Sequence, residues 1–351
     1  MKVKGVKFGL YLSTPTPALN AYIVDAQRVD QMGFDSLWAA DHLLTVPSGG
    51  KVPDVWTMFT AIASVTSHVR LGSFVSDAFR RHPAVFAQQL ATLDCLSNGR
   101  VTLGMGAGEM MNLEQFGIRW EKPVSRFVEA VEIMRKLWSG EVFDYEGQFW
   151  QLKDAVLQIQ PLQESIPIYF GANGSRTKEL TGRIGDGWLP CCMSPELYKK
   201  HLKDVKEGAR KAGRSIDEID RVLYVYTAIS EDHESALKQL EPYKASIVLW
   251  PKILDGAGYV AECPAIAEAD FYSNILMNEE GERKFEEYGK FVPMEVVEDF
   301  SIAGTVDDCI EQIEDYIEAG VSHFAFVPVG PEPMRVLLRY SRDIIPYFKN
   351  R

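Results

Sequence analysis

The stretch PAVFAQQLATLDCLSNGRVTLGMGAG (83–108) contains one complete example of the pattern that decides the fold. Its first part predicts a helix over 83–99, with a proline in the first turn and a glycine as the stop signal. Its second part, RVTLGMGAG (100–108), predicts a strand. A strand that follows a helix so closely is typical of a chain in which the two elements alternate.

The same alternation runs along the rest of the chain. Strands are expected at 6–13, 36–42, 69–77, 100–108, 167–174, 186–192, 221–230 and 321–330, and nearly all of them precede a helix. Strands that are apolar on both faces and separated by helices indicate a parallel sheet. Eight such units predict a closed (β/α)8 TIM barrel, with a doubly wound open sheet as the alternative.

Two stretches interrupt this rhythm. Residues 141–166 predict an excursion with short strands of its own, and residues 251–304 predict an insertion that covers a substrate. Because no low-complexity linker separates two halves, residues 1–351 are expected to form a single barrel domain with these two insertions.

Composition excludes several classes of partner. The formal net charge of −12 disfavours nucleic acid and anionic membranes as partners. No apolar run reaches the roughly 18–20 residues that cross a bilayer, and the N-terminus lacks a signal-peptide pattern. The five cysteines are scattered without a CxxC pair, so we expect reduced thiols, a cytoplasmic location and no metal site.

In such a barrel the active site lies where the strands end. The strand at 100–108 runs into GMGAGEMMN (104–112), which presents Glu109 and Asn112. Glu109, among methionines and glycines, would be a poorly solvated acid suited to proton donation, or else a solvated loop acid. Asp41 and His42 end another strand, and His42 could protonate a substrate, donate a hydrogen bond to it, or be purely structural.

A second glycine-rich turn, GANGS (171–175), leads from a strand into a helix. It predicts either a phosphate cradle at the helix N-terminus or a tight turn that needs positive φ at Asn173 or Gly174. GMGAGE, by contrast, is not a dinucleotide-binding fingerprint, because no acidic residue falls at the right distance. Its glycines are expected to let a flat ring or a chain backbone lie close.

Several motifs in combination resemble a known family. They are ADH (40–42), GSFVSDAFRRHPAVFAQQLATLD (72–94), LSNGRVTLGMGAGEMMN (96–112), IPIYFGANG (166–174), GRIGDGW (182–188) and AGVSHFAFVPVGP (319–331). With these motifs the chain resembles the bacterial-luciferase-like flavin and deazaflavin oxidoreductases, and within them the branch that uses coenzyme F420. The stretches FGIRWEKPVSRFVEAVEIMRKLWSGE (116–141) and FSIAGT (300–305) look most like the methylenetetrahydromethanopterin reductases.

The resemblance implies a barrel that holds the deazaflavin at the strand ends, with hydride passing between its C5 and a substrate carbon. It implies catalytic roles for Asp41, His42 and Glu109, and a cis peptide bond at Ser73–Phe74 behind the ring. The coenzyme-binding residues that it implies are Asp41, His42, Ser73, Phe74, Glu109, Asn112, Gly171, Ala172, Asn173 and Gly174.

Departures from the family pattern bear on the substrate. Sugar-phosphate dehydrogenases of this branch carry a tryptophan where this chain has Val46 and a lysine in the loop that here reads CCMSPEL (191–197), which disfavours a phosphorylated sugar. Ser13-Thr14-Pro15, Leu10-Tyr11 and Glu109 depart from the alcohol dehydrogenases or the methanopterin reductases. The substrate is therefore expected to be a tetrahydromethanopterin derivative or a secondary alcohol.

Two alternatives stay open on this resemblance. One is an FMN-dependent monooxygenase of the same superfamily, and the other is a barrel that binds the coenzyme without chemistry. A homodimer or a larger homo-oligomer is expected in each case.

Overall fold

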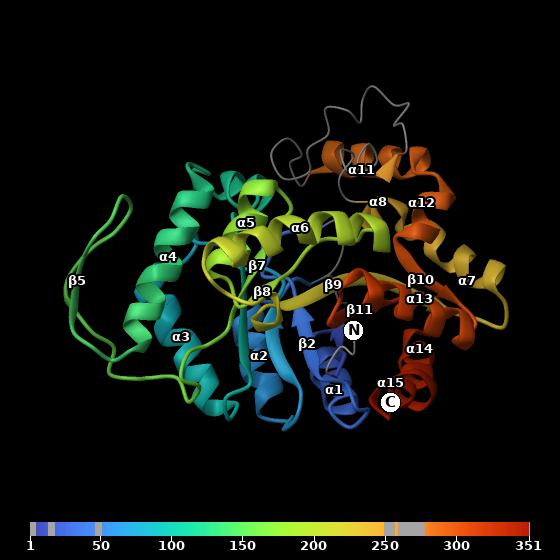
Figure 1. Ribbon diagram of the computed structural model, residues 1–351, viewed down its shortest axis with the longest axis horizontal. Coiled ribbons are helices and arrows are strands. Elements are labelled where there is room, and N and C mark those ends of the chain that lie inside the picture. Colours follow the sequence, from blue (N-terminus) through green and yellow to red (C-terminus); the bar gives the residue numbers. More distant parts are fainter. Residues whose placement is uncertain (1–4, 13–17, 46–50, 249–256, 259–277, 351) are drawn as a thin grey trace.

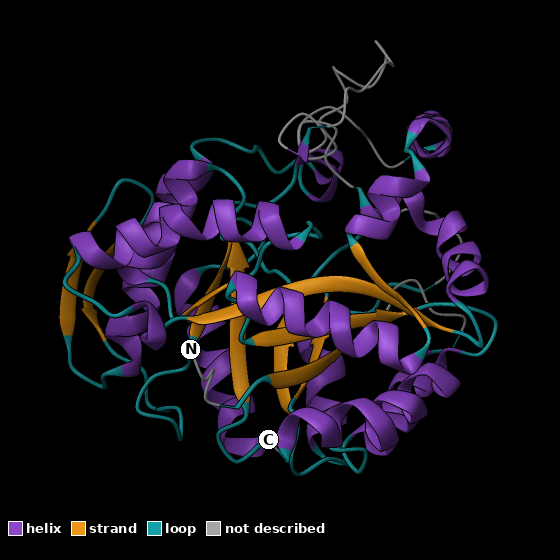
Figure 2. Ribbon diagram, turned by 45° about the vertical axis from the view of Figure 1, so that its right-hand side comes forward, coloured by secondary structure: helices purple, strands orange, loops and turns teal. Residues whose placement is uncertain are grey.

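A computed structural model describes residues 5–12, 18–45, 51–248, 257–258 and 278–350. Its centre is a ring of parallel strands surrounded by helices (Figures 1 and 2). In ring order the strands are β1 (Lys7–Tyr11), β2 (Ser36–Ala39), β3 (Arg70–Ser73), β4 (Val101–Gly106), β7 (Ile168–Gly171), β8 (Gly187–Trp188), β9 (Asp220–Ile229) and β11 (His323–Pro328). Since β11 pairs with β1, the ring closes, and the predicted eight-stranded barrel is confirmed.

The helices between the strands form the outer layer, and polar side chains cap several of them. Asp54 caps α2 by accepting a hydrogen bond from Thr57 N at 2.8 Å, and Ser194 caps α6 by accepting one from Leu197 N at 3.3 Å. The helices are α1 (Leu19–Val29), α2 (Val55–Ala63), α3 (Pro83–Leu96), α4 (Pro123–Trp138), α5 (Ser175–Ile184), α6 (Pro195–Lys211), α7 (His233–Leu240), α8 (Lys244–Ile247), α13 (Val306–Ala319), α14 (Pro333–Arg339) and α15 (Ile345–Lys349).

The stretch 251–304 differs from its expected form. It ends in α11 (Glu279–Phe291), α12 (Met294–Asp299) and a strand that the sequence pattern missed, β10 (Ser301–Gly304), while residues 251–256 and 259–277 lie outside the described part. β10 pairs with β9 at Tyr226–Ile229, and β8 pairs with the same strand only at Asp220 and Arg221. Four residues next to an acidic helix carry too little periodicity to stand out as a strand.

α7 and α8 do not form one continuous helix. Residues Glu241–Tyr243 form a 3-10 turn between α7 and α8. Proline at position 242 has no N–H to continue the α-helical ladder, which explains the break.

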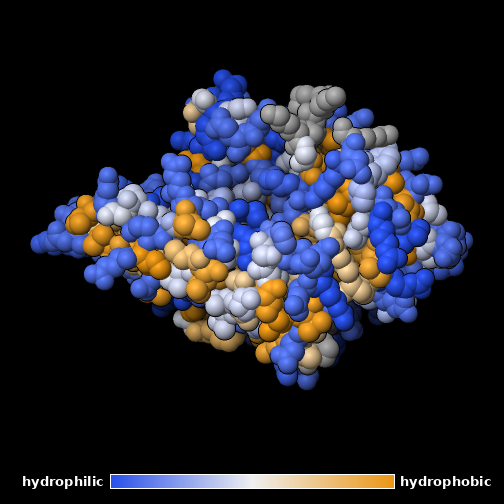
Figure 3. Space-filling model, turned by 90° about the horizontal axis from the view of Figure 1, so that it is seen from below, coloured by the Kyte–Doolittle hydropathy of each residue, from blue (hydrophilic) through white to orange (hydrophobic). Residues whose placement is uncertain are grey.

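The expected excursion at 141–166 is an antiparallel hairpin of β5 (Phe143–Glu146) and β6 (Gln151–Ala155). It stands at the left edge of Figure 1, and the same side projects as a wedge in Figure 3. Buried Glu129 of α4 anchors its turn, because its carboxylate accepts backbone hydrogen bonds from Gln148, Phe149 and Trp150.

A buried polar network fills the amino ends of the strands. His323 Nδ1 lies 3.0 Å from Asp220 Oδ2, and His323 Nε2 lies 2.7 Å from Ser36 Oγ. The Tyr169 hydroxyl and the Lys7 ammonium also donate to Asp220, at 2.8 and 2.9 Å. Because every one of these groups has a partner, this end of the barrel is suited to stability rather than to reaction.

None of the described helices combines the length and the hydropathy needed to span a bilayer.

Candidate active site

A cavity of about 400 Å³ opens at the carboxyl ends of the strands. Loops after five of the barrel strands contribute to it, together with residues of β1 and β9, so it gathers residues from across the sequence. Its walls are formed by Tyr11, Asp41, His42, Thr45, Phe74, Val75, Asp77, Arg80, Gly106, Ala107, Gly108, Glu109, Met111, Asn112, Trp120, Gly171, Asn173, Gly174, Thr177, Leu189, Cys191, Tyr224, Tyr226, Ser246 and Phe285.

Aromatic rings form part of these walls. The ring centroids of Tyr11 and Tyr224 are 4.9 Å apart, and those of Phe74 and Tyr224 are 5.3 Å apart. The Tyr224 hydroxyl donates to the Tyr226 hydroxyl at 3.3 Å. Burial raises the pKa of Tyr11, Tyr224 and Tyr226 well above the usual value, so all three phenols stay neutral near pH 7.

The polar side of the cavity carries the predicted acid and histidine as a pair. His42 Nε2 lies 3.3 Å from Glu109 Oε2, and both side chains are about one fifth exposed, at 20% and 18%. A histidine and a carboxylate at this distance are able to share or relay a proton. The sequence placed these two residues on separate loops, and the fold brings them together.

Asn112 joins the two loops that carry this pair. Its Nδ2 donates to Glu109 Oε2 at 3.1 Å, and its Oδ1 accepts from the backbone N–H groups of Leu43 and Leu44 at 2.7 and 3.0 Å. Since Asn112 is only 3% exposed, its amide serves the protein's own loops, although it also borders the cavity.

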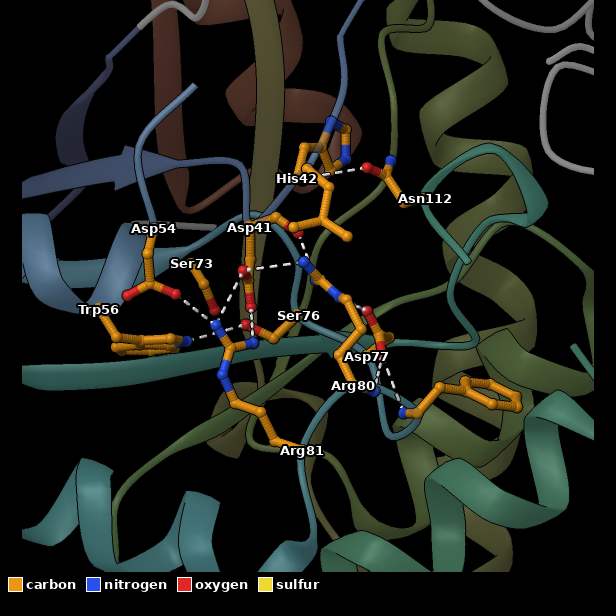
Figure 4. Close-up of polar contacts among 12 residues, drawn as sticks. Asp41, His42, Asp54, Trp56, Ser73, Ser76, Asp77, Arg80, Arg81 and Asn112 are labelled. Carbon is orange, nitrogen blue, oxygen red and sulfur yellow. Dashed lines mark hydrogen bonds and ion pairs between the residues drawn. The ribbon is translucent and has the colours of Figure 1, made fainter. Parts of the chain in front are cut away.

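Asp41 lies beneath His42 and is held by two arginines (Figure 4). Arg81 Nη1 lies 2.7 Å from Asp41 Oδ2, and Arg80 Nη1 lies 3.3 Å from Asp41 Oδ1. Burial opposes the charge on Arg81, but Asp41 and Asp54 outweigh it and raise the pKa of Arg81. Because both carboxylate oxygens of Asp41 face guanidinium groups, the geometry favours a positioning role for Asp41 over proton transfer.

The cis peptide bond lies one residue later than expected. It joins Phe74 to Val75, while the Ser73–Phe74 bond is trans. Phe74 and Val75 both line the cavity, whereas Ser73 is fully buried and its hydroxyl bridges β3 to β4 through Gly104. The expected cis bond would have followed Ser73, the last residue of β3. The observed cis bond follows Phe74, the first residue after the strand.

The glycines of GMGAGE are required for different structural reasons. A Cβ at Gly104 would overlap the carbonyl oxygen of Ser73, so this glycine permits close contact between two strands. Gly108 has a φ of +79°, which reverses the chain just before Glu109. Gly106 and Gly108 border the cavity as expected, and Gly104 serves the barrel wall.

The turn Gly171–Gly174 lies at the cavity edge, ahead of α5. Gly174 has a φ of −80°, and Asn173 does not have a positive φ either. The predicted alternative of a tight turn with positive φ at one of these residues is therefore wrong. Gly174 gives α5 no side-chain cap, which leaves first-turn N–H groups open to an anion. Ala172 is the exception in this set, because it is buried away from the cavity and its carbonyl accepts from Trp188 Nε1 at 2.7 Å.

Some cavity residues escaped the sequence analysis, notably Arg80, Asp77, Trp120 and Thr177. No local pattern marks Arg80, because its carboxylate partners Asp77 and Asp41 lie in two different loops. Ser13, Thr14 and Val46, whose departures bear on the substrate, lie outside the described residues. Within the described part, no group of three or more His, Cys, Asp or Glu side chains is arranged to hold a metal ion.

Comparison with known sequences identifies the family and several relatives of this chain. The luciferase-like monooxygenase family model matches residues 6–323. The 5,10-methylenetetrahydromethanopterin reductase of Archaeoglobus fulgidus is 32% identical over 350 residues, which cover 98% of this chain and 100% of that one. The F420-dependent glucose-6-phosphate dehydrogenase of Amycolatopsis mediterranei is also 32% identical, over 92% of each chain.

Solved structures agree. The coenzyme F420-dependent tetrahydromethanopterin reductase of Methanopyrus kandleri aligns with a TM-score of 0.84 and 27% identity, over 98% of this chain and 100% of that one. An F420-dependent secondary alcohol dehydrogenase bound to an F420–acetone adduct shares the fold, with a TM-score of 0.82, 24% identity and coverage of 97% and 98%. The chain therefore belongs to the luciferase-like monooxygenase family, among oxidoreductase relatives of which several are named as F420-dependent.

Proposed function

We propose that this protein is a coenzyme F420-dependent oxidoreductase that transfers hydride between deazaflavin C5 and a substrate carbon, most like methylenetetrahydromethanopterin reductase. The observation that carries the proposal is the His42–Glu109 pair at 3.3 Å, placed on the polar side of a cavity with aromatic walls. Such a cavity suits a planar ring, and the pair is placed to handle a proton at its edge.

The residues present fit the coenzyme. Gly106 and Gly171 leave the cavity wall without side chains, and a Cβ at either would come within 3.0 Å of Val75. The uncapped first turn of α5 offers N–H groups to a phosphate, with Gly174 and Thr177 at the cavity edge. Gly171 to Gly174 would therefore hold the phosphate, and Phe74 and Val75 would lie against the ring.

When bound, the deazaflavin supplies or accepts the hydride. The protein's own contribution is position and proton handling. Glu109, hydrogen-bonded by Asn112 and adjacent to His42, would hold the proton that accompanies hydride transfer. The phenols of Tyr224 and Tyr226 stay neutral, so they add no charge to the cavity.

Charge in the cavity argues against a phosphorylated sugar. Among the described wall residues, the only arginine or lysine is Arg80, and all three of its guanidinium nitrogens already meet Asp41 or Asp77. Within the described part of the wall, this arrangement leaves no free guanidinium or ammonium group for a sugar phosphate, which is compatible with a tetrahydromethanopterin derivative as the substrate. A secondary alcohol is the second candidate, since His42 beside Glu109 is suited to act as the base for an alcohol hydroxyl.

The substrate test uses the purified protein and F420, with the coenzyme absorbance followed. We expect turnover with methylene-tetrahydromethanopterin and little with glucose 6-phosphate. Faster turnover with isopropanol would identify a secondary alcohol, rather than the pterin, as the substrate. Fast turnover with glucose 6-phosphate would contradict the argument that the cavity lacks a cation for a sugar phosphate.

The cofactor test is a titration with F420 and FMN in parallel. Tighter binding of F420 is expected, whereas preference for FMN would favour the monooxygenase alternative. Binding of F420 without turnover of any of the three substrates would favour a protein that stores the coenzyme. We further expect the protein to act in the cytoplasm of a cell that makes coenzyme F420, as a homodimer or larger homo-oligomer.

A further inference from the structure

Arg80 connects two of the loops that surround the cavity (Figure 4). Its Nε donates to Asp77 Oδ2 at 2.5 Å, in the loop after β3, and its Nη1 lies 3.3 Å from Asp41 Oδ1, in the loop after β2. Its Nη2 donates to the backbone carbonyl of Asp41. The side chain is only 9% exposed, so these contacts are shielded from competing water.

The Asp41 carbonyl belongs to the peptide group that leads into His42. Its hydrogen bond to Arg80 fixes the plane of that peptide. On the far side of His42, Asn112 accepts from the N–H groups of Leu43 and Leu44. The backbone of His42 is thus held on both sides, from the loops that follow β3 and β4.

We infer that Arg80 is a positioning residue, which orients the Asp41–His42 peptide and thereby keeps His42 Nε2 at 3.3 Å from Glu109 Oε2. This inference rests on the proposed function for its activity test. Arg80 acts through His42, and its own nitrogens are committed to the protein.

Arg81 provides a matched control. It also pairs with the Asp41 carboxylate, at 2.7 Å, and its other partner is Asp54 at 2.6 Å. It lies on the side of Asp41 away from His42, outside the described cavity wall (Figure 4). Loss of either arginine removes one cation from Asp41, but only loss of Arg80 releases the Asp41 carbonyl.

The experiment compares Arg80→Gln with Arg81→Gln in the full-length protein. We expect Arg80→Gln to lower kcat about 100-fold, because small misplacements of catalytic groups have effects of this size. Its Kd for F420 should change far less. Arg81→Gln should lower the melting temperature to a similar extent but reduce kcat much less than Arg80→Gln does.

A conservative variant keeps the test decisive if Arg80→Gln does not fold. Arg80→Lys keeps the charge but cannot reach all three partners, so we expect it to recover part of the lost kcat with a near-normal melting temperature. The inference is overturned if Arg80→Gln and Arg80→Lys turn over like the wild type. It is also overturned if Arg81→Gln loses as much activity as Arg80→Gln.

A second readout does not need turnover. In protein labelled only at its six histidines, the ring signals of His42, assigned with His42→Ala, should shift and broaden in Arg80→Gln and stay in place in Arg81→Gln. Unmoved His42 signals in Arg80→Gln would overturn the inference even if no substrate is found. Inactive wild-type protein, in contrast, would count only against the proposed function.

Discussion

Two side chains from different loops contact the Glu109 carboxylate. Asn112 donates to Oε2 at 3.1 Å, and His42 Nε2 lies 3.3 Å from the same oxygen. Glu109 also lines the cavity. The residue is therefore fixed by one neighbour and able to exchange a proton with the other.

We predict that Glu109→Gln lowers kcat by about 100-fold or more, the usual range for loss of a general acid or base. The isosteric amide keeps the side chain's shape, so the Kd for F420 should change much less. Steady-state kinetics and fluorescence titration measure the two quantities. Glu114→Gln, an exposed acid five positions along the chain, serves as the control. Unchanged turnover in Glu109→Gln would remove the acid role.

The sequence selected candidate residues for this site, but it did not show the contacts that hold them. Strand-end position alone was enough to select Asp41, His42 and Glu109. The roles of Arg80 and Arg81 depend on partners 39 and 40 positions away, and no local pattern connects such residues.

Among the elements, α5 contributes Thr177 to the cavity wall, and its first turn follows Gly171–Gly174 directly. It packs closely on α6 through glycines on both helices. A Cβ at Gly182 would overlap the carbonyl oxygen of Val205, and one at Gly208 would overlap that of Glu179. The orientation of α5 is thus set by this contact at its far end.

We predict that Gly182→Ala destabilises the protein by about 1–3 kcal/mol, the usual cost of overpacking. The clash is with backbone, so no side-chain rotation relieves it. Chemical denaturation measures the change, and F420 titration should show weaker binding because α5 is displaced. Gly174→Ala is the matched control for stability, since its Cβ would meet only Thr177 Oγ1 at 3.7 Å. Equal stability of the two variants would contradict the packing argument.

Helices and strands were predictable where their own residues show the hydrophobic periodicity of the element. The helix and the strand of 83–108 have clear start and stop signals. The structure places the helix at Pro83–Leu96 and the strand at Val101–Gly106. β10 was missed because it is a four-residue strand whose identity comes from its pairing with β9. Tertiary pairing of this kind is not encoded in local periodicity.

At the scale of the whole molecule, the two ends of the barrel have different tasks. The carboxyl ends carry the cavity, while the amino ends carry buried carboxylates with complete sets of partners. Burial opposes the charge on Asp30, but N–H groups of Val69, Ser67 and His68 outweigh it and lower the pKa of Asp30 to about 2. Burial also opposes the charge on Asp220, yet His323 and Lys7 lower its pKa well below the usual range.

These shifts predict acid sensitivity. A carboxyl group with a lowered pKa stabilises the folded state above its unfolded pKa of about 4, and this stabilisation is lost as pH falls toward the folded value. The free energy of unfolding should therefore drop between about pH 4 and pH 2, measured by urea denaturation at each pH. Asp30→Asn should flatten this dependence, whereas Asp25→Asn, which changes a more exposed acid on α1 just before Asp30, should leave it unchanged. A profile that is flat in the wild type would contradict the prediction.

The pairing of β8 with β9 has a consequence for how the ring moves. Only Gly187–Asp220 and Trp188–Arg221 join these strands, whereas β9 and β11 pair over six positions. β8 is held by only two pairs on its other side as well, where it meets β7, so we expect thermal opening of the ring at this short strand. Hydrogen–deuterium exchange should be faster for backbone amides of Gly187 and Trp188 than for those of β11. Since Leu189 and Cys191 continue from β8 into the cavity wall, opening of the ring at β8 would widen the entrance through which a large ligand passes.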